Sequence, residues 1–283
     1  MSLNSVHTNM GAMVALQSLE KTQQELTVTQ KRISTGLRVA DASDDGAAYA
    51  IAQGIRSTVG ALTSANQQLG SVQGLLSTTH SGLNNISSML GSMRDVLVKL
   101  ADSSIQSNDR TNYQKQYASM LSNVKTFVQD ANYNGKTLIG DLTGSSGTFG
   151  RVAISRNENG STYGVATFSG SALFGSVSFT TTQLSSAATV AALITATGTF
   201  LNQQNSLGRE LNTIGSSINY VNNQTTYNND KINALNSGLG SLIDADLAKE
   251  SAQLTALQIR QQLGTQALSL ANQAPQSLLS LFK

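Results

Sequence analysis

The sequence predicts a mainly α-helical protein with a small β region: long terminal helices that form an α-helical coiled coil, plus an elongated helical-bundle domain that carries β-hairpins. Apolar residues recur three, four or seven positions apart through most of the chain, which is the repeat of amphipathic helices and coiled coils. The 283 residues include a single proline, so few positions would end a long helix. Between residues 136 and 183 apolar residues alternate among Gly, Ser and Thr, which favours short strands.

The first expected helix carries large aliphatic residues at seven-residue spacing, at Leu19, Leu26 and Ile33. Gly36 follows at the point where a residue in the left-handed conformation would end the helix. Periodicity alone leaves two alternatives open, a coiled coil and an ordinary amphipathic helix packed within one domain.

A second helix is expected from about Gly46 to Leu100, which corresponds to roughly 80 Å of helix. Ser43, Asp44 and Asp45 precede it as candidate N-caps. No single compact core requires a helix of that length. Its apolar stripe comprises Val72, Leu75, Leu76, Leu83, Ile86, Leu90, Met93 and Leu97.

The middle of the chain is expected to change from helix to strand and back. The residues from Ser103 to Arg110 read as a turn before another helix, and Asn134-Gly135 is a strong hairpin-turn signal. Three alternating pairs predict strands: Val152 with Ile154, Tyr163 with Val165, and Val177 with Phe179. The helical pattern resumes near Ser186.

The last segment, from about 238 to 283, again has leucines at helical spacing. One row contains Leu235, Leu242, Ala256, Leu263 and Leu270, and a second contains Leu247, Leu254 and Leu268. Since both ends have similar length and pattern, we expect the two terminal segments to be neighbours in space.

The composition favours repeated contact between copies over chemistry. Charged residues make up 12% of the chain, against about 25% in typical globular proteins, and neutral polar side chains replace them. Such a surface costs less to desolvate than a charged one. The net charge of +2 comes with no cluster of Lys and Arg among aromatics, and no run of about 18 apolar residues exists. We therefore expect neither a nucleic acid nor a membrane as partner.

No constellation typical of an enzyme is present. Cysteine is absent, which excludes disulfides and thiolate metal sites, and the two histidines, His7 and His80, form no His-Glu-x-x-His motif. Two pairs of nearby carboxylates occur, Asp44 with Asp45 and Asp244 with Asp246. Their neighbours suggest helix caps and linker contacts and not acid–base catalysis. The expectation is no catalytic residue, no metal and no cofactor.

Several motifs in order at both ends make the chain resemble a bacterial flagellin, a short one with a reduced variable central region. At the N-terminal end they are Gln30-Lys-Arg-Ile-Ser-Thr-Gly-Leu-Arg-Val39 and Asp41-Ala-Ser-Asp-Asp-Gly-Ala-Ala48. At the C-terminal end they are Gln258-Ile-Arg-Gln-Gln-Leu-Gly-Thr-Gln-Ala-Leu268 and the segment from Ala271 to Phe282. The resemblance covers about residues 3–140 and 195–283.

The resemblance implies a structural subunit of the flagellar filament, which self-assembles into a helical tube for motility and is secreted to the outside of the cell. It implies an inner-tube terminal coiled coil from residues 1–40 and 238–283. The outer α-helical rod domain would comprise 41–140 and 187–237, and 141–186 would be a short variable β or loop region. The terminal helices of such subunits become ordered on assembly.

The resemblance also implies roles for individual residues. The assembly residues would be Leu16, Leu19, Leu26, Ile33, Leu247, Leu254, Leu257, Leu263, Leu268 and Leu270. The linker between the inner and outer domains would contain Arg38, Asp41, Asp44 and Asp45. An export chaperone would bind Leu278, Leu279, Leu281 and Phe282, and Ser or Thr residues within 143–186 would be candidates for bearing glycans.

Partners implied by the resemblance are copies of the chain, the export chaperone, the cap and hook–filament junction proteins, and a type III export apparatus. An innate immune receptor binds flagellins on the segment that matches Leu90 to Lys99. Here Arg94 and Asp95 keep a basic–acidic pair, whereas Ser92 stands where the family has an arginine. That departure favours a solvated helix face over receptor recognition.

Two alternative functions belong to other classes. The first is a flagellin-like surface protein that binds a polysaccharide, for which the stacking candidates are Tyr133, Tyr163, Phe168 and Phe174. Because sugar sites usually stack rings on aromatics and the chain has no Trp, this alternative is the weaker one. The second is a relative of the hook–filament junction or cap proteins.

Overall fold

The computed structural model describes residues 9–140, 142 and 152–280, with side chains described as far as residue 273. The chain forms two compact units, one from residues 1–58 with 233–283 and one from residues 59–232. Two long helices, α2 (Gly46–Leu100) and α7 (Thr199–Ile243), contribute residues to both units.

The first unit is built around helix α1 (Met10–Thr35), whose two ends are set by local signals. At its start the Asn9 side chain accepts a hydrogen bond from the Ala12 amide at 3.0 Å. At its end Gly36 has φ of 71°, and its amide donates to the Arg32 carbonyl. The helix end expected at Gly36 is therefore confirmed.

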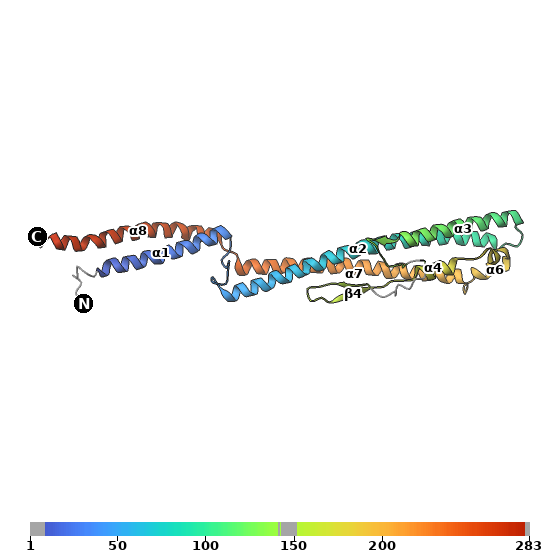
Figure 1. The fold of residues 1–283 in the computed structure, drawn as a ribbon, viewed down its shortest axis with the longest axis horizontal. Coiled ribbons are helices and arrows are strands. Elements are labelled where there is room, and N and C mark those ends of the chain that lie inside the picture. The colour runs from blue at the N-terminus through green and yellow to red at the C-terminus, as the bar shows by residue number, and fades with distance from the viewer. Residues whose placement is uncertain (1–8, 141, 143–151, 281–283) are drawn as a thin grey trace. The chain divides into compact units, whose positions relative to one another are not determined.

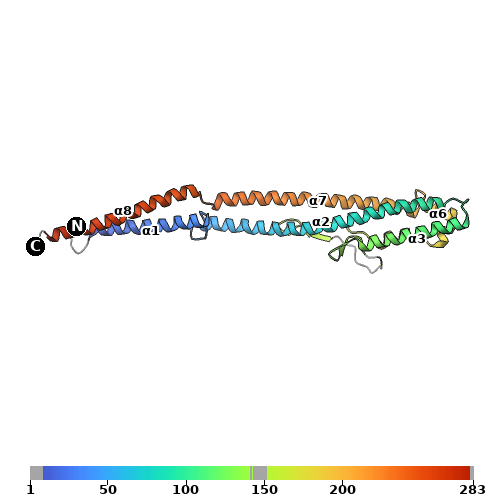
Figure 2. The same ribbon diagram turned by 90° about the horizontal axis from the view of Figure 1, so that it is seen from above.

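Helix α8 (Leu247–Ser280) lies beside α1 in both views (Figures 1 and 2). The two run antiparallel, since Asn9 donates to the Ala271 carbonyl at 2.7 Å at one end of the pair. At the other end Arg32 lies 3.1 Å from Glu250. The two terminal helices are thus spatial neighbours, as the sequence predicts.

The second unit has its core along α2, beside α7 and α3 (Ser107–Asp130) (Figure 1). The predicted stripe of α2 is confirmed, since its members are buried except for the half-buried Val72. Side-chain amides join α2 to α7: Asn66 donates to Asn229 at 2.8 Å, and Gln73 donates to Asn222 at 2.7 Å. Helix α3 begins at Ser107, so the turn expected from Ser103 to Arg110 is shorter than predicted.

Two antiparallel hairpins carry the strands of the second unit. Strands β1 (Asn132–Tyr133) and β2 (Lys136–Thr137) flank Asn134 and Gly135, which both have positive φ as a tight two-residue hairpin turn requires. Strands β3 (Val152–Ser155) and β4 (Thr162–Val165) form the second hairpin. In this hairpin Tyr163 stacks on Tyr220 of α7, with ring centroids 3.9 Å apart.

The strand expected at Val177 and Phe179 is wrong. Helix α4 (Gly170–Val177) occupies that stretch, and the short helices α5 (Thr181–Ser185) and α6 (Ala187–Leu193) follow it. Ser169 and Thr180 cap α4 and α5. The alternation of Val177 and Phe179 reflects tertiary burial: Val177 closes the helix inside the core, and Phe179 stacks on Tyr117.

The start of α4 depends on a close approach that only glycine allows. A Cβ added at Gly170 would lie 2.6 Å from Val128 Cγ1 and 2.9 Å from the Ile139 carbonyl oxygen. We expect Gly170→Ala to lower the free energy of unfolding of the second unit by about 1–3 kcal/mol. Gly175→Ala, in the same helix with open space at its Cβ, is the matched control and should stabilise or be neutral. Urea denaturation followed by circular dichroism measures both, and equal stabilities would contradict the packing described.

Candidate assembly surface and linker

The α1–α8 pair buries few side chains. From α1 these are Thr22, Leu26 and Thr29, and from the described part of α8 they are Glu250 and Leu257. The Thr22 hydroxyl donates to the Ser18 carbonyl of its own helix at 2.9 Å, and not to α8. A seam with two fully buried leucines gives little hydrophobic stabilisation for about sixty ordered residues.

The predicted assembly residues divide into two sets. Leu26 and Leu257 are buried in the seam, and Leu19, Ile33, Leu254 and Leu268 are half-buried. Leu19 also packs closely against the backbone of α8, because a Cβ built on Gly264 would lie 3.3 Å from Leu19 Cδ1. Leu16, Leu247, Leu263 and Leu270 instead face outward, with 47%, 50%, 59% and 71% of their surface exposed.

Except for Leu247, the outward-facing leucines belong to apolar rows that the described part of the chain leaves uncovered. On α1 the row also contains Met10, Met13 and Val14, each more than half exposed. On α8 it contains Ile259, which is 54% exposed. Contiguous exposed apolar surface usually marks a site of protein contact.

Backbone hydrogen bonds join the segment that follows α1 to the segment that precedes α8. Leu37 and Asp244 form an isolated antiparallel bridge, and the Arg38 amide donates to the Ile243 carbonyl at 2.7 Å. The Arg38 guanidinium donates to the Leu242 carbonyl at 2.5 Å. Val39, Ala48, Ala52 and Ile243 form a small apolar cluster at the same junction. The predicted linker residue Arg38 therefore ties together the segments that follow α1 and precede α8.

The predicted linker carboxylates have separate tasks. Asp45 accepts hydrogen bonds from the Ala47 and Ala48 amides and so caps α2. Asp41 and Asp44 both receive the Lys31 ammonium, at 2.6 and 3.0 Å. The hydrogen bond from Lys31 holds the pKa of both carboxyls below its usual range and raises the pKa of Lys31.

Sequence reasoning missed two participants in the seam, Arg32 and Glu250. The sequence analysis gives neither residue a role in the seam, whereas the Arg32 guanidinium lies against the buried Glu250 carboxylate. No local pattern signals this partnership, because the two residues are 218 positions apart. Asp246, read as a cap, does cap α8 through the Ala248 and Lys249 amides.

Some predicted site residues lie outside the description. The side chains of Leu278 and Leu279 are not described, and Leu281 and Phe282 lie outside the described residues. Residues 143–151 of the expected glycan-bearing region also lie outside them. In the segment proposed for an immune receptor, Ser92, Arg94 and Asp95 are exposed on α2.

Comparison with known families decides the identity of this arrangement. The description "Bacterial flagellin N-terminal helical region" matches residues 6–143, and "Bacterial flagellin C-terminal helical region" matches residues 194–282. The chain is 33% identical over 287 residues to flagellin FljM of Caulobacter vibrioides, with all of both chains covered. The chain belongs to the bacterial flagellin family.

Other flagellins are similar over the same extent. A flagellin of Brucella melitensis is 34% identical over 285 residues and 99% of each chain. A crystal structure of Bacillus cereus flagellin aligns with a TM-score of 0.37 at 18% identity, covering 66% of this chain and 94% of that one. The unmatched stretch between the two family regions contains the β3–β4 hairpin and helices α4 to α6.

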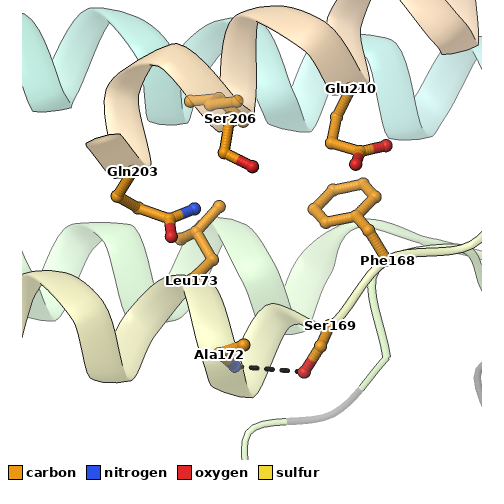
Figure 3. A pocket seen from close by; sticks show the side chains of 8 residues that line it. Phe168, Ser169, Ala172, Leu173, Gln203, Ser206 and Glu210 are labelled. Atoms are coloured by element: carbon orange, nitrogen blue, oxygen red, sulfur yellow. Dashed lines mark hydrogen bonds between the residues drawn. The ribbon is translucent and has the colours of Figure 1, made fainter. Parts of the chain in front are cut away.

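A pocket in the described part of this flagellin lies between α4 and α7 (Figure 3). It holds about 200 Å³, with Phe168 on one side and Gln203, Ser206 and Glu210 on the other. Sites for small molecules are usually about 300–1,000 Å³. Of the other aromatic candidates, Tyr163 is stacked on Tyr220, Tyr133 covers Gly74, and Phe174 packs on the core. Nothing in this geometry supports polysaccharide binding.

Neither a metal site nor a membrane-spanning helix is found among the described residues. No group of three or more His, Cys, Asp or Glu residues is placed to hold a metal ion. Among the helices described, none is both apolar and long enough to cross a bilayer.

The linker should respond to acid in a defined direction. Because the pKa values of Asp41 and Asp44 are depressed, their contribution to stability is present above the ordinary value of 3.8 and is lost as pH falls below it. We expect Lys31→Gln to raise both pKa values, because it removes the donor. Carboxyl carbon NMR titration measures them, with Lys21→Gln as a control that removes one charge from the same helix. An ordinary Asp41 pKa in the unsubstituted chain would contradict the contact.

Proposed function

We propose that this flagellin is a structural subunit of the bacterial flagellar filament, in which the outward-facing apolar rows of α1 and α8 are buried by neighbouring copies. The observation that carries this is the exposure of Leu16, Leu247, Leu263 and Leu270 on helices whose mutual seam is thin. A monomer gains nothing from presenting these rows to water. A neighbouring copy that covers them supplies the burial that the seam lacks.

The contact between copies is heterologous, meaning that two different surfaces meet. α1 and α8 present different apolar rows, with methionines on α1 and Ile259 with leucines on α8. Heterologous contacts that do not close produce an open helical polymer. The low charge of the chain favours this packing, because few ions need to be desolvated.

Finer features of the proposal follow from membership of the family. The subunit leaves the cell through a type III export apparatus and acts outside it, with the C-terminal leucines and Phe282 bound by an export chaperone beforehand. The filament has cap and hook–filament junction proteins at its two ends. Residues 1–40 with 238–283 form the inner tube, and 41–140 with 187–237 form the outer domain.

The subunit has a structural role and no enzymatic one. The family is structural, and the described carboxylates of the linker are occupied as caps and as partners of Lys31. The chemistry expected of Asp44, Asp45, Asp244 and Asp246 is therefore that of ordinary surface hydrogen bonding.

The first test is polymerisation of purified chain on filament fragments, followed by electron microscopy. The intact chain is expected to elongate the fragments, whereas removal of residues 1–40 or 240–283 should stop growth because each removes one terminal helix. Growth that is unaffected by both truncations would exclude the proposal.

A sharper prediction concerns Leu263→Asp. Because Leu263 is 59% exposed in the chain, the substitution should leave the unfolding transition of the monomer unchanged. It should raise the monomer concentration needed for growth by about tenfold or more, since burying an apolar side chain contributes about 1.5–3 kcal/mol. Sedimentation of polymer from monomer measures this concentration.

Two further variants serve as comparisons for Leu263→Asp. Gln262→Asp adds the same carboxylate at the neighbouring exposed position and should have the smaller effect. Leu257→Asp acts differently, because it buries a charge in the α1–α8 seam itself and should disorder that pair. Normal filaments from Leu263→Asp would mean that the outward row is not an assembly surface.

A further inference from the structure

We propose that the Arg32–Glu250 ion pair fixes the axial register of α1 against α8, and so determines which apolar rows the terminal pair presents to other copies. The claim that other copies bind these rows rests on the proposed function, whereas the register of α1 against α8 is a property of the single chain.

Seven-residue repeats do not select one register. Leu19, Leu26 and Ile33 repeat along α1, and Leu247 with Leu254, and Leu263 with Leu270, repeat along α8. A slip of one heptad, roughly 10 Å along the helix axis, keeps each of these residues on the same face of its helix. Apolar side chains also lie on several faces of α8, since Leu257 is buried while Ile259 and Leu263 are exposed. Apolar packing therefore favours the native register mainly through Leu257 and through Leu19 against Gly264, and polar contacts add to this preference.

The ion pair favours one register, the same one in which the backbone bridge joins Leu37 to Asp244. Arg32 Nη1 lies 3.1 Å from Glu250 Oε1, and the exposed fractions of the two side chains are 32% and 9%. A burial this deep makes the loss of either partner costly, because the other charge is then left uncompensated. The pair of Glu25 with Arg260 is by contrast loose and exposed, at 3.8 Å with 38% and 65% of the side chains exposed. Of these two ion pairs, the first discriminates more strongly between registers, and the hydrogen bond from Gln261 to Gln23 at 2.7 Å fits the same register.

A slip in either direction is penalised. If α8 slips by seven residues one way, Glu250 comes opposite Glu25, and two carboxylates face each other. If it slips the other way, Arg32 comes opposite Leu257 and its charge is buried against an apolar side chain. The native register is the one in which both charges are compensated.

The pair also leaves part of its hydrogen-bonding capacity unused. Arg32 Nε and Glu250 Oε2 are buried in the described chain without a hydrogen-bond partner. Unsatisfied buried atoms destabilise, so this ion pair specifies alignment at a cost in stability. A polar pair at a buried position is a known way for paired helices to set their register.

The absence of cysteine allows a direct measurement of register in the full-length chain. A Cβ built on Gly11 would lie 3.9 Å from Ala271 Cβ, which is within the range that a disulfide spans. Gly11→Cys with Ala271→Cys therefore reports the native register. Gly11→Cys with Gly264→Cys reports a slip of one heptad, because residue 264 lies seven positions before residue 271. The yield of intramolecular disulfide under mild oxidation is read for both reporters.

In the otherwise unsubstituted chain the native reporter should cross-link at least about tenfold more than the slipped one. Glu250→Arg should reverse this preference, because slipping brings the new arginine opposite Glu25. Arg32→Glu should lower the native yield without raising the slipped one, since slipping then brings carboxylates together. The double variant R32E/E250R should restore the native yield and, with it, elongation of filament fragments.

Two further variants separate register from general stability. Arg32→Lys keeps the positive charge but loses the planar guanidinium group. It should retain most of the preference for the native over the slipped disulfide. Arg260→Glu makes the same kind of charge reversal at the exposed pair, and should leave both yields unchanged.

Three results would overturn the inference. One is equal yields from the two reporters in the unsubstituted chain, and another is Glu250→Arg leaving their ratio unchanged. The third is failure of R32E/E250R to restore the native yield. Failure of the cysteine-free chain to elongate filament fragments would instead count against the proposed function, whatever the cross-linking shows.

Discussion

The structure depends on one thin interface, the antiparallel pairing of α1 with α8. This seam buries two leucines, two threonines and one glutamate among the side chains described. Ordering helices of 26 and 34 residues costs more conformational entropy than such a seam returns. The pair is therefore built to be completed by other chains, and its polar interruptions limit how stable it is before they arrive.

The linker shows how a thin interface can still be well defined. Gly36 stops α1 and Asp45 starts α2, while Lys31 holds the intervening carboxylates and backbone bonds fix the return segment at Ile243. These contacts join residues that are close in sequence or are made by backbone atoms, so they do not depend on a large core. The adjacent Arg32–Glu250 pair extends this definition into the helical seam. Alignment is thus set by polar contacts, and apolar surface remains available for neighbouring copies.

Helix ends and the first hairpin were predictable because local chemistry determines them. Gly36 and Asn134-Gly135 adopt positive φ, and Asp45 caps the helix that follows. The stretch around Val177 was not predictable, since its alternation records which side chains reach the core of the second unit and not a strand. Nor could periodicity separate buried Leu257 from exposed Leu263, because leucines surround α8. Glu250 was missed because its partner is distant in sequence.

Backbone amide hydrogen exchange, compared between monomer and filament, tests most directly whether neighbouring copies complete the terminal helices. Amides of α1 and of α8 as far as residue 273 should exchange quickly in the monomer and at least about a hundredfold more slowly in the filament, because assembly suppresses local opening. Core amides of α2 near Leu83, Ile86 and Leu90, which are fully buried within the chain, should be protected in both states. Terminal helices that are equally protected in monomer and filament would contradict the account.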